Sequence, residues 1–213
     1  MPNDTLSSKT RERLIDVARQ LFSNNGLENT TMSEIATASD KGRRTIYTYF
    51  RTKHEIYEAV IQSESRKVCR ELQNLVDREQ TPEMKLRKLM EFRIALAGRQ
   101  ANRPEVWLRS LFSRDSKRDN RIRAYVKDYV LDTMDSILRQ GVDSGAFDPV
   151  QASRVPSLLT VLVLGSDWDL LRRDNSADAG IPPPPSSEHM QKAIDFIIDA
   201  LRRIPTGTDE IQT

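Results

Sequence analysis

A short basic segment, residues 41–53, contains the residue types that bind nucleic acids. It reads Lys-Gly-Arg-Arg-Thr-Ile-Tyr-Thr-Tyr-Phe-Arg-Thr-Lys, with five basic residues and no acidic one. The whole chain has a formal net charge of only +2, so its positive charge is concentrated in this segment. Arginine can donate two hydrogen bonds to guanine or bind phosphate, threonine offers a hydroxyl and a methyl group to base edges, and tyrosine can donate to phosphate. The segment therefore predicts a surface that contacts duplex DNA.

The predicted contact residues lie on two expected helix starts and on one short helix between them. Lys53 begins a helix whose amino-terminal end favours an anion, and Thr31 caps a helix and could also meet phosphate. A solvated basic turn rich in Thr and Tyr is the alternative interpretation. The predicted DNA-contacting residues are Thr31, Arg43, Arg44, Thr45, Tyr47, Thr48, Tyr49 and Lys53.

The elements that must position these residues form a helix-turn-helix at about residues 31–50. A first helix, about 8–24 and capped by Ser7 or Ser8, has apolar residues at helical spacing and stops at Asn25-Gly26. Thr31 and Glu34 predict a capping box for a short second helix that ends near residue 39. A third helix spans about 43–50, and a fourth spans about 52–77 with Thr52 and Glu55 as a further capping box. Two short helices joined tightly and braced by a longer one are typical of a helix-turn-helix.

The remainder of the chain also predicts helices, about nine in all, and therefore an all-α fold. The expected further segments are 82–98, 104–114, 119–143, 149–173 and 187–204, and four prolines at 182–185 exclude a helix there. Cys69 is the only cysteine, so the chain has no internal disulfide and no cysteine-based zinc site. The start lacks the apolar core of a signal peptide, and the longest apolar run is too short to span a bilayer. A cytoplasmic protein without a cofactor or metal is expected.

An enzyme is the competing class of function, and the sequence offers it little support. The two histidines, His54 and His189, are far apart in the chain. No glycine-rich phosphate loop and no metal-ligand spacing is present. Asp167 and Asp169 are two residues apart on an expected helix and therefore point to different faces. We predict that the chain is not an enzyme.

Residues 10–62 resemble the N-terminal domain of the TetR family of bacterial regulators. The resemblance rests on Leu21-Phe22 before Gly26, on Thr31 before Ile35-Ala36, and above all on the run Thr-Ile-Tyr-x-x-Phe-x-x-Lys at residues 45–53. The turn differs, because Asp40-Lys41-Gly42 stands where the family usually has Gly-Val-Ser. The resemblance implies a helix-turn-helix domain at 1–52 and a helical effector-binding and dimerisation domain at 53–205. Residues 206–213 are expected to be a disordered tail.

A homodimer is also expected from apolar helices late in the sequence. Residues 155–171 are apolar nearly all round in their first half, so they must be buried on more than one side. Pairing this helix and the last helix with their symmetry mates would give a four-helix interface, although both could serve only the monomer's own core. The predicted interface residues are Leu158, Leu162, Trp168, Met190, Ile194, Ile197 and Leu201.

The resemblance further implies an effector pocket in the body, whose ligand the sequence does not identify. Aromatic residues at helical spacing are more often core than ligand site. The candidate pocket residues are Phe92, Arg93, Trp107, Phe112, Tyr125, Tyr129 and Trp168. The expected function is a repressor that a small molecule releases from a palindromic DNA operator by moving the fourth helix. An effector-independent regulator or an activator of the same fold is the alternative.

Overall fold

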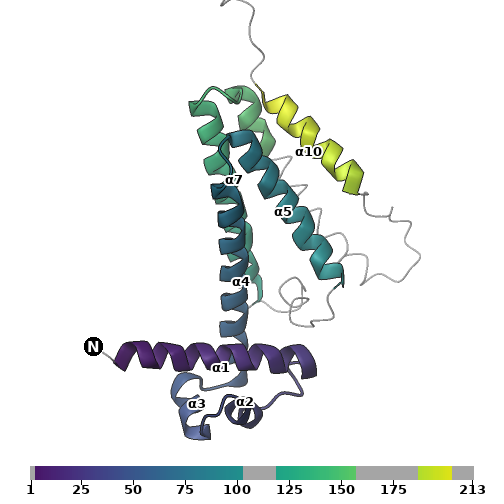
Figure 1. Cartoon of the computed structure of the whole chain (residues 1–213). Coiled ribbons are helices and arrows are strands. Elements are labelled where there is room, and N and C mark those ends of the chain that lie inside the picture. Colours follow the sequence, from purple (N-terminus) through teal and green to yellow (C-terminus); the bar gives the residue numbers. More distant parts are fainter. Residues whose placement is uncertain (1–2, 103–118, 157–186, 203–213) are drawn as a thin grey trace, which may run out of the picture. The chain divides into compact units, whose positions relative to one another are not determined.

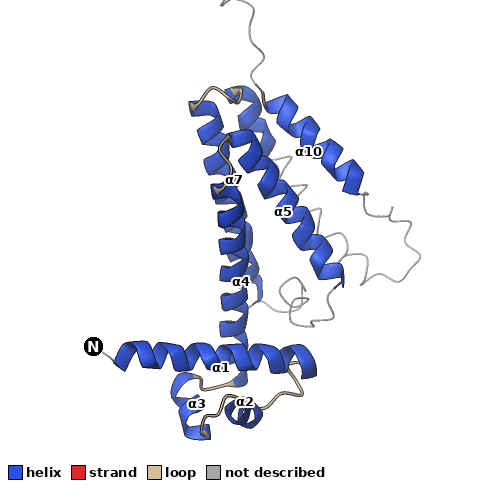
Figure 2. Cartoon of the chain, in the orientation of Figure 1, coloured by secondary structure: helices blue, strands red, loops and turns tan. Residues whose placement is uncertain are grey.

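A computed structural model of the chain describes residues 3–102, 119–156 and 187–202 (Figure 1). In this part every element is a helix, and the β pairing is limited to an isolated bridge between Phe147 and Arg202 (Figure 2). The predicted all-α fold is confirmed. Residues 149–156 are also helical, and the other helices are α1 (Asn3–Asn25), α2 (Met32–Ala38), α3 (Arg43–Tyr49), α4 (Lys53–Asp77), α5 (Pro82–Asn102), α7 (Asp119–Asp143) and α10 (Ser187–Leu201).

The predicted helix ends are correct to within a few residues, with two differences. The first helix begins at Asn3, so Ser7 and Ser8 lie inside it and do not cap it. Residues 3–25 contain no glycine or proline that would interrupt a helix, and a serine inside a helix lowers its stability only modestly. The helix predicted for 82–98 continues to Asn102, the last residue described before the gap at 103–118. The helix predicted at 104–114, the later part of 149–173 and the tail at 206–213 lie outside the described residues.

The chain divides into two compact units. The first comprises Met1–Val68 with Asn102–Val126, and the second comprises Cys69–Ala101 with Lys127–Thr213. The helix α4 is continuous and contributes buried residues to both units, among them Ile56 in the first and Leu72 in the second.

The first unit contains a head in which α1 lies across α2 and α3, and the beginning of α4 completes the core (Figure 1). Phe22 of α1 is buried and meets Tyr57 of α4 edge to face, with the ring centroids 5.9 Å apart. The two short helices each contribute few apolar residues, so they depend on α1 and α4 for their stability. The buried core of the head is Leu14, Ile15, Ala18, Phe22, Ile35, Ala36, Ile46, Phe50, Ile56, Ala59 and Val60.

The connection between α2 and α3 is a tight turn built around Asp40. Its φ of 57° lies in the left-handed region, which is unusual for a residue other than glycine. The N–H of Asp40 donates to the carbonyl of Thr37 at 3.1 Å, and the N–H of Lys41 donates to the carbonyl of Ala36 at 2.9 Å. These two bonds form a Schellman motif, which satisfies the last carbonyls of α2 and reverses the chain into α3.

The second unit holds α5, the greater part of α7 and α10 around one apolar core. Leu86 and Leu89 of α5, Met134 of α7 and Ile198 of α10 are all buried. An ion pair between Arg87 and Asp195 at 2.6 Å joins α5 to α10. None of the helices in the described part of the chain is long and apolar enough to cross a membrane.

The corner after α7 depends on a close contact between Gly141 and the buried ring of Phe147. A Cβ atom at position 141 would overlap that ring. The N–H of Asp148 then donates to the carbonyl of Leu201 at 2.8 Å, and the Asp148 carboxylate accepts from the N–H groups of the next helix. The corner thereby attaches the end of α10 to the end of α7.

Candidate nucleic-acid interface

The helix α3 buries one face in the head and leaves the other face to solvent. Ile46 is fully buried, whereas Arg43, Arg44, Tyr47 and Thr48 are exposed. Tyr47 is 46% exposed, so much of this large aromatic side chain is accessible to solvent. These four residues of the predicted contact set therefore lie on one accessible surface.

Two other predicted contact residues on α3 are only half accessible. Tyr49 packs against the core of the head, and Thr45 is partly covered. Their contact with DNA stays a prediction.

In the described part of the chain, the three arginines of this surface have no carboxylate partner. Among the described residues, no carboxylate forms an ion pair with the side chains of Arg43, Arg44 or Arg51. Glu55, four residues after Arg51, accepts from the backbone N–H of Arg51 at 2.7 Å and not from its guanidinium group. Since nothing in the described structure offsets these charges, they remain available to a polyanion.

Thr48 presents a particular chemistry because its hydroxyl is already engaged. The hydroxyl donates to the carbonyl of Arg44 at 3.0 Å, within the same helix. Its oxygen can still accept a hydrogen bond, and its methyl group is on the exposed side chain. Thr48 therefore suits an exocyclic amino group or a thymine methyl better than a phosphate, which offers only acceptors.

Thr31 forms the capping box predicted for α2, and this role occupies its hydroxyl. The hydroxyl accepts from the N–H of Glu34 at 3.2 Å and donates to the Glu34 carboxylate at 2.9 Å, while the Thr31 N–H donates to the same carboxylate at 2.7 Å. The cap is confirmed. The contact of Thr31 with phosphate stays a prediction, and the adjacent carboxylate of Glu34 would oppose it.

The start of α4 differs in detail from the second predicted capping box. The Thr52 hydroxyl accepts from the N–H of Glu55 at 3.2 Å, as expected, but the Glu55 carboxylate accepts from Arg51 and not from Thr52. Lys53 donates from Nζ to the carbonyl of Glu28 at 3.1 Å, so it joins α4 to the loop before α2. Two donors of this ammonium group are left for a phosphate.

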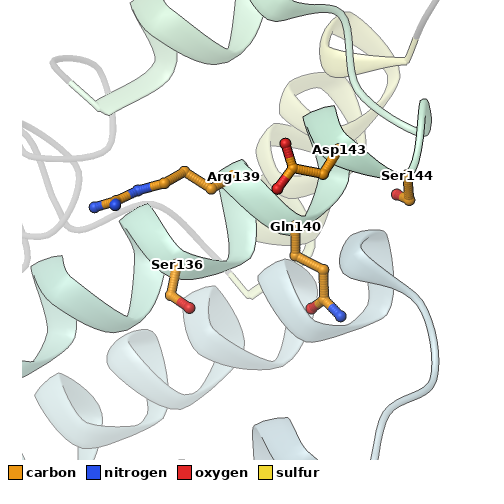
Figure 3. A pocket seen from close by; sticks show the side chains of 5 residues that line it. All are labelled: Ser136, Arg139, Gln140, Asp143 and Ser144. Carbon is orange, nitrogen blue, oxygen red and sulfur yellow. The ribbon is translucent and has the colours of Figure 1, made fainter.

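The described structure includes four of the seven residues predicted for an effector pocket and does not test the pocket itself. Phe92 and Arg93 are buried, Tyr125 is 48% exposed, and the Tyr129 hydroxyl donates to the side-chain carbonyl of Gln73 at 2.6 Å. Trp107, Phe112 and Trp168 lie outside the described residues. A polar groove near the end of α7 is lined by exposed side chains of Ser136, Arg139, Gln140, Asp143 and Ser144 (Figure 3). This open, aromatic-free groove differs from the predicted pocket, which stays a prediction.

The residues predicted for a dimer interface divide into two groups. Ile194, Ile197 and Leu201 are already buried within one chain, so they have little surface left for a partner, and Met190 is half-buried. Leu158, Leu162 and Trp168 lie outside the described residues. The large exposed apolar residue of α10 is Phe196, at 75% exposure, which the predicted set does not include. The interface stays a prediction.

Comparison with known proteins identifies the head. Residues 14–60 match the family model for bacterial regulatory proteins of the tetR family. The chain is 35% identical over 54 residues to the HTH-type transcriptional regulator AcrR of Shigella flexneri. That match covers 25% of this chain and 25% of AcrR, so it spans about a quarter of the curated relative.

Solved structures extend the likeness to the fold of nearly the whole chain. A TetR transcription regulator from Haloarcula marismortui has a TM-score of 0.66 and 18% identity, with 92% of this chain and 100% of that chain covered. The transcriptional regulator FadR from Bacillus subtilis, solved in complex with stearoyl-CoA, has a TM-score of 0.57 and 14% identity, with coverage of 90% and 99%. At these identities the likeness shows a shared architecture.

Proposed function

We propose that this chain is a repressor of the TetR type, whose homodimer binds a palindromic operator and is released by a small-molecule effector; the match of residues 14–60 to the tetR family model and the shared fold support this. The observation that carries the proposal is the outer face of α3. There Arg43, Arg44, Tyr47 and Thr48 are exposed on a helix that the capped α2 and the buried Ile46 hold in place. These side chains supply both base-edge and phosphate contacts.

The length of α3 supports binding as a dimer. The helix has 7 residues, and few of its side chains can reach bases at once. Two copies related by a twofold axis read two half-sites, about 34–36 Å apart along one face of the duplex.

Release by an effector is supported by the continuity of α4 and by the fold. A change in the body that moves α4 would change the spacing of the two α3 helices and so weaken their simultaneous engagement. The effector must bind the DNA-free conformation more tightly than the DNA-bound one. FadR, which shares the architecture, was solved in complex with stearoyl-CoA. The shared fold supports a ligand site in this chain, but it does not identify the ligand.

Selection of genomic DNA fragments with the purified full-length protein tests the proposal. We expect enriched fragments to share an inverted repeat whose half-sites are about one helical turn apart. Arg44→Ala should relax the preference at one base position per half-site, because a bidentate contact contributes about 1–3 kcal/mol of discrimination. Lys53→Ala should weaken binding to all sequences alike. Enrichment of no sequence, or of sites without symmetry, would contradict the proposal.

A release screen on the selected DNA then separates the repressor from its alternatives. The protein–DNA complex is challenged with a library of small molecules while the affinity is followed by fluorescence anisotropy. A compound that lowers the affinity, and that binds more weakly to the DNA complex than to the free protein, supports release by an effector. Transcription from the selected promoter that rises when the protein is added would instead favour an activator.

A further inference from the structure

Arg11 of α1 lies over the ring of Phe50, the residue that follows α3. Its Cζ atom is 5.1 Å from the ring centroid. Phe50 is only 3% exposed, whereas Arg11 is exposed, so the guanidinium group covers the ring from the solvent side. A stacked guanidinium keeps the N–H groups at its edges free for hydrogen bonds.

Nothing in the described structure uses those N–H groups. No carboxylate of the described residues forms an ion pair with Arg11, and no hydrogen bond from its side chain is present there. By contrast, Arg19 of the same helix lies 3.6 Å from the carboxylate of Glu64 and 3.9 Å from that of Asp16. The arginines of α1 thus differ: one is paired across helices, and one is held in place but keeps its charge available.

We propose, on the basis of the DNA-binding function proposed above, that Arg11 is a phosphate-binding residue that contacts the DNA backbone beside the groove occupied by α3. Phe50 caps the carboxyl end of α3, and its N–H donates to the carbonyl of Ile46 at 2.9 Å. The stacked Arg11 therefore lies at the end of the reading helix, on the residue that precedes Arg51, although it comes from another part of the sequence. A phosphate oxygen pair matches the planar fork of a guanidinium.

The stacking also explains why this arginine should bind more effectively than a free surface arginine. A guanidinium already fixed on a ring loses less side-chain entropy when it binds. Its position beside α3, and not on the outer face of that helix, suits a backbone contact that is independent of sequence. The sequence alone does not indicate it, because Lys9, Arg11 and Arg13 alternate with Thr10 and Glu12 as on an ordinary solvated helix.

The test compares Arg11→Gln with Arg13→Gln in the full-length protein. Arg13 is exposed on the same helix, but its side chain is rotated about 200° from Arg11 around the helix axis. The two variants therefore remove the same charge from different faces of α1. Affinity for a duplex carrying the selected operator, and for one of scrambled sequence, is measured over a range of salt concentrations. Arg11→Lys is measured as well, because it keeps the charge and loses the planar stack.

For a dimer with one such contact in each half, Arg11→Gln should reduce the log–log salt slope by about 0.9 per subunit on the operator duplex. The ratio of the wild-type affinity to the Arg11→Gln affinity should then fall about 12-fold when the salt concentration rises from about 50 to about 200 mM. Arg13→Gln should keep the wild-type slope, and Arg11→Lys should stay close to it. Affinity for both duplexes should fall in Arg11→Gln.

The inference is overturned if Arg11→Gln keeps the wild-type slope. A variant with an unchanged slope but a lower melting temperature would show that Arg11 only covers Phe50. Equal behaviour of Arg11→Lys and Arg11→Gln would likewise assign the effect to the ring contact. If the wild-type protein binds no duplex, the proposed DNA-binding function itself is wrong. If the wild type binds and Arg11→Gln binds with the same affinity and slope, only the inference about Arg11 is wrong.

Discussion

The cap of α3 offers a sharp test of how the reading helix is held. Gly42 occupies the N-cap position with φ −67° and ψ 151°, and no side chain caps the helix there. These angles suit any residue, and a Cβ atom at this position would meet nothing within 4 Å. Serine therefore fits without strain and brings a hydroxyl that can accept from the N–H of Thr45 or its neighbour.

The expected magnitude follows from a comparison of two variants with the same added Cβ atom. Gly42→Ser and Gly42→Ala both restrict the unfolded chain, which favours folding by about 0.4–1 kcal/mol in each. Only serine caps the helix, and an N-cap serine is more stable than alanine by about 1 kcal/mol. Gly42→Ser should therefore be more stable than Gly42→Ala by roughly that amount, and at least as stable as the wild type.

Urea unfolding of the three proteins measures this difference, and hydrogen exchange of the amides in the first turn of α3 locates it. We expect slower exchange for Arg44 or Thr45 in Gly42→Ser than in Gly42→Ala, with unchanged exchange in α7 and α10. Equal stability of the two variants, or a difference that appears in the body and not in α3, would refute the reasoning. DNA affinity should follow the same order, because a more ordered reading helix binds at a lower entropic cost.

Three further predictions concern the turn, the corner and the thiol. Asp40→Gly should raise the free energy of unfolding by roughly 0.5–1 kcal/mol while Asp40→Val lowers it by more than about 1 kcal/mol, because position 40 has left-handed backbone; equal unfolding midpoints in urea would contradict this. Gly141→Ala should cost about 1–3 kcal/mol through overlap with Phe147, and Phe147→Leu in the same chain should recover part of that loss in a double-mutant cycle; strict additivity would argue against the contact. Burial raises the pKa of the Cys69 thiol, so a thiol reagent at mildly alkaline pH should modify the folded protein roughly tenfold more slowly than the urea-unfolded protein. Because the thiol ionises at lower pH in the unfolded chain, the free energy of unfolding should fall as the pH rises. Similar modification rates would show that Cys69 is accessible in the folded protein.

Local signals made the head predictable from the sequence. Thr31 and Glu34 lie three residues apart, and a capping box requires only that spacing, so the start of α2 follows directly. Ile46 and Phe50 share one face of a helical turn, and both are buried. The contacts that decide these features lie within four residues of one another, which is the range over which spacing is informative.

Features that depend on distant residues were not predictable in the same way. The left-handed backbone of Asp40 is set by the hydrogen bonds that end α2, and aspartate itself is a weak indicator of it. The fit of Gly141 under Phe147 and the stacking of Arg11 on Phe50 join helices or turns whose packing no short pattern encodes. On α10, Ile194 and Ile197 are buried within one chain, and an apolar stripe alone does not distinguish residues of a core from residues of an interface.

The exposed face of α3 should distinguish one DNA sequence from another. The measurement that tests it most directly is the ratio of affinities for the selected operator and for a scrambled duplex, in the wild type and in an Arg44→Ala, Thr48→Ala double variant. We predict that the variant loses most of this ratio, by about 1–3 kcal/mol for each base contact removed, while it unfolds at the wild-type temperature. A double variant that folds normally and keeps the full ratio would contradict the claim.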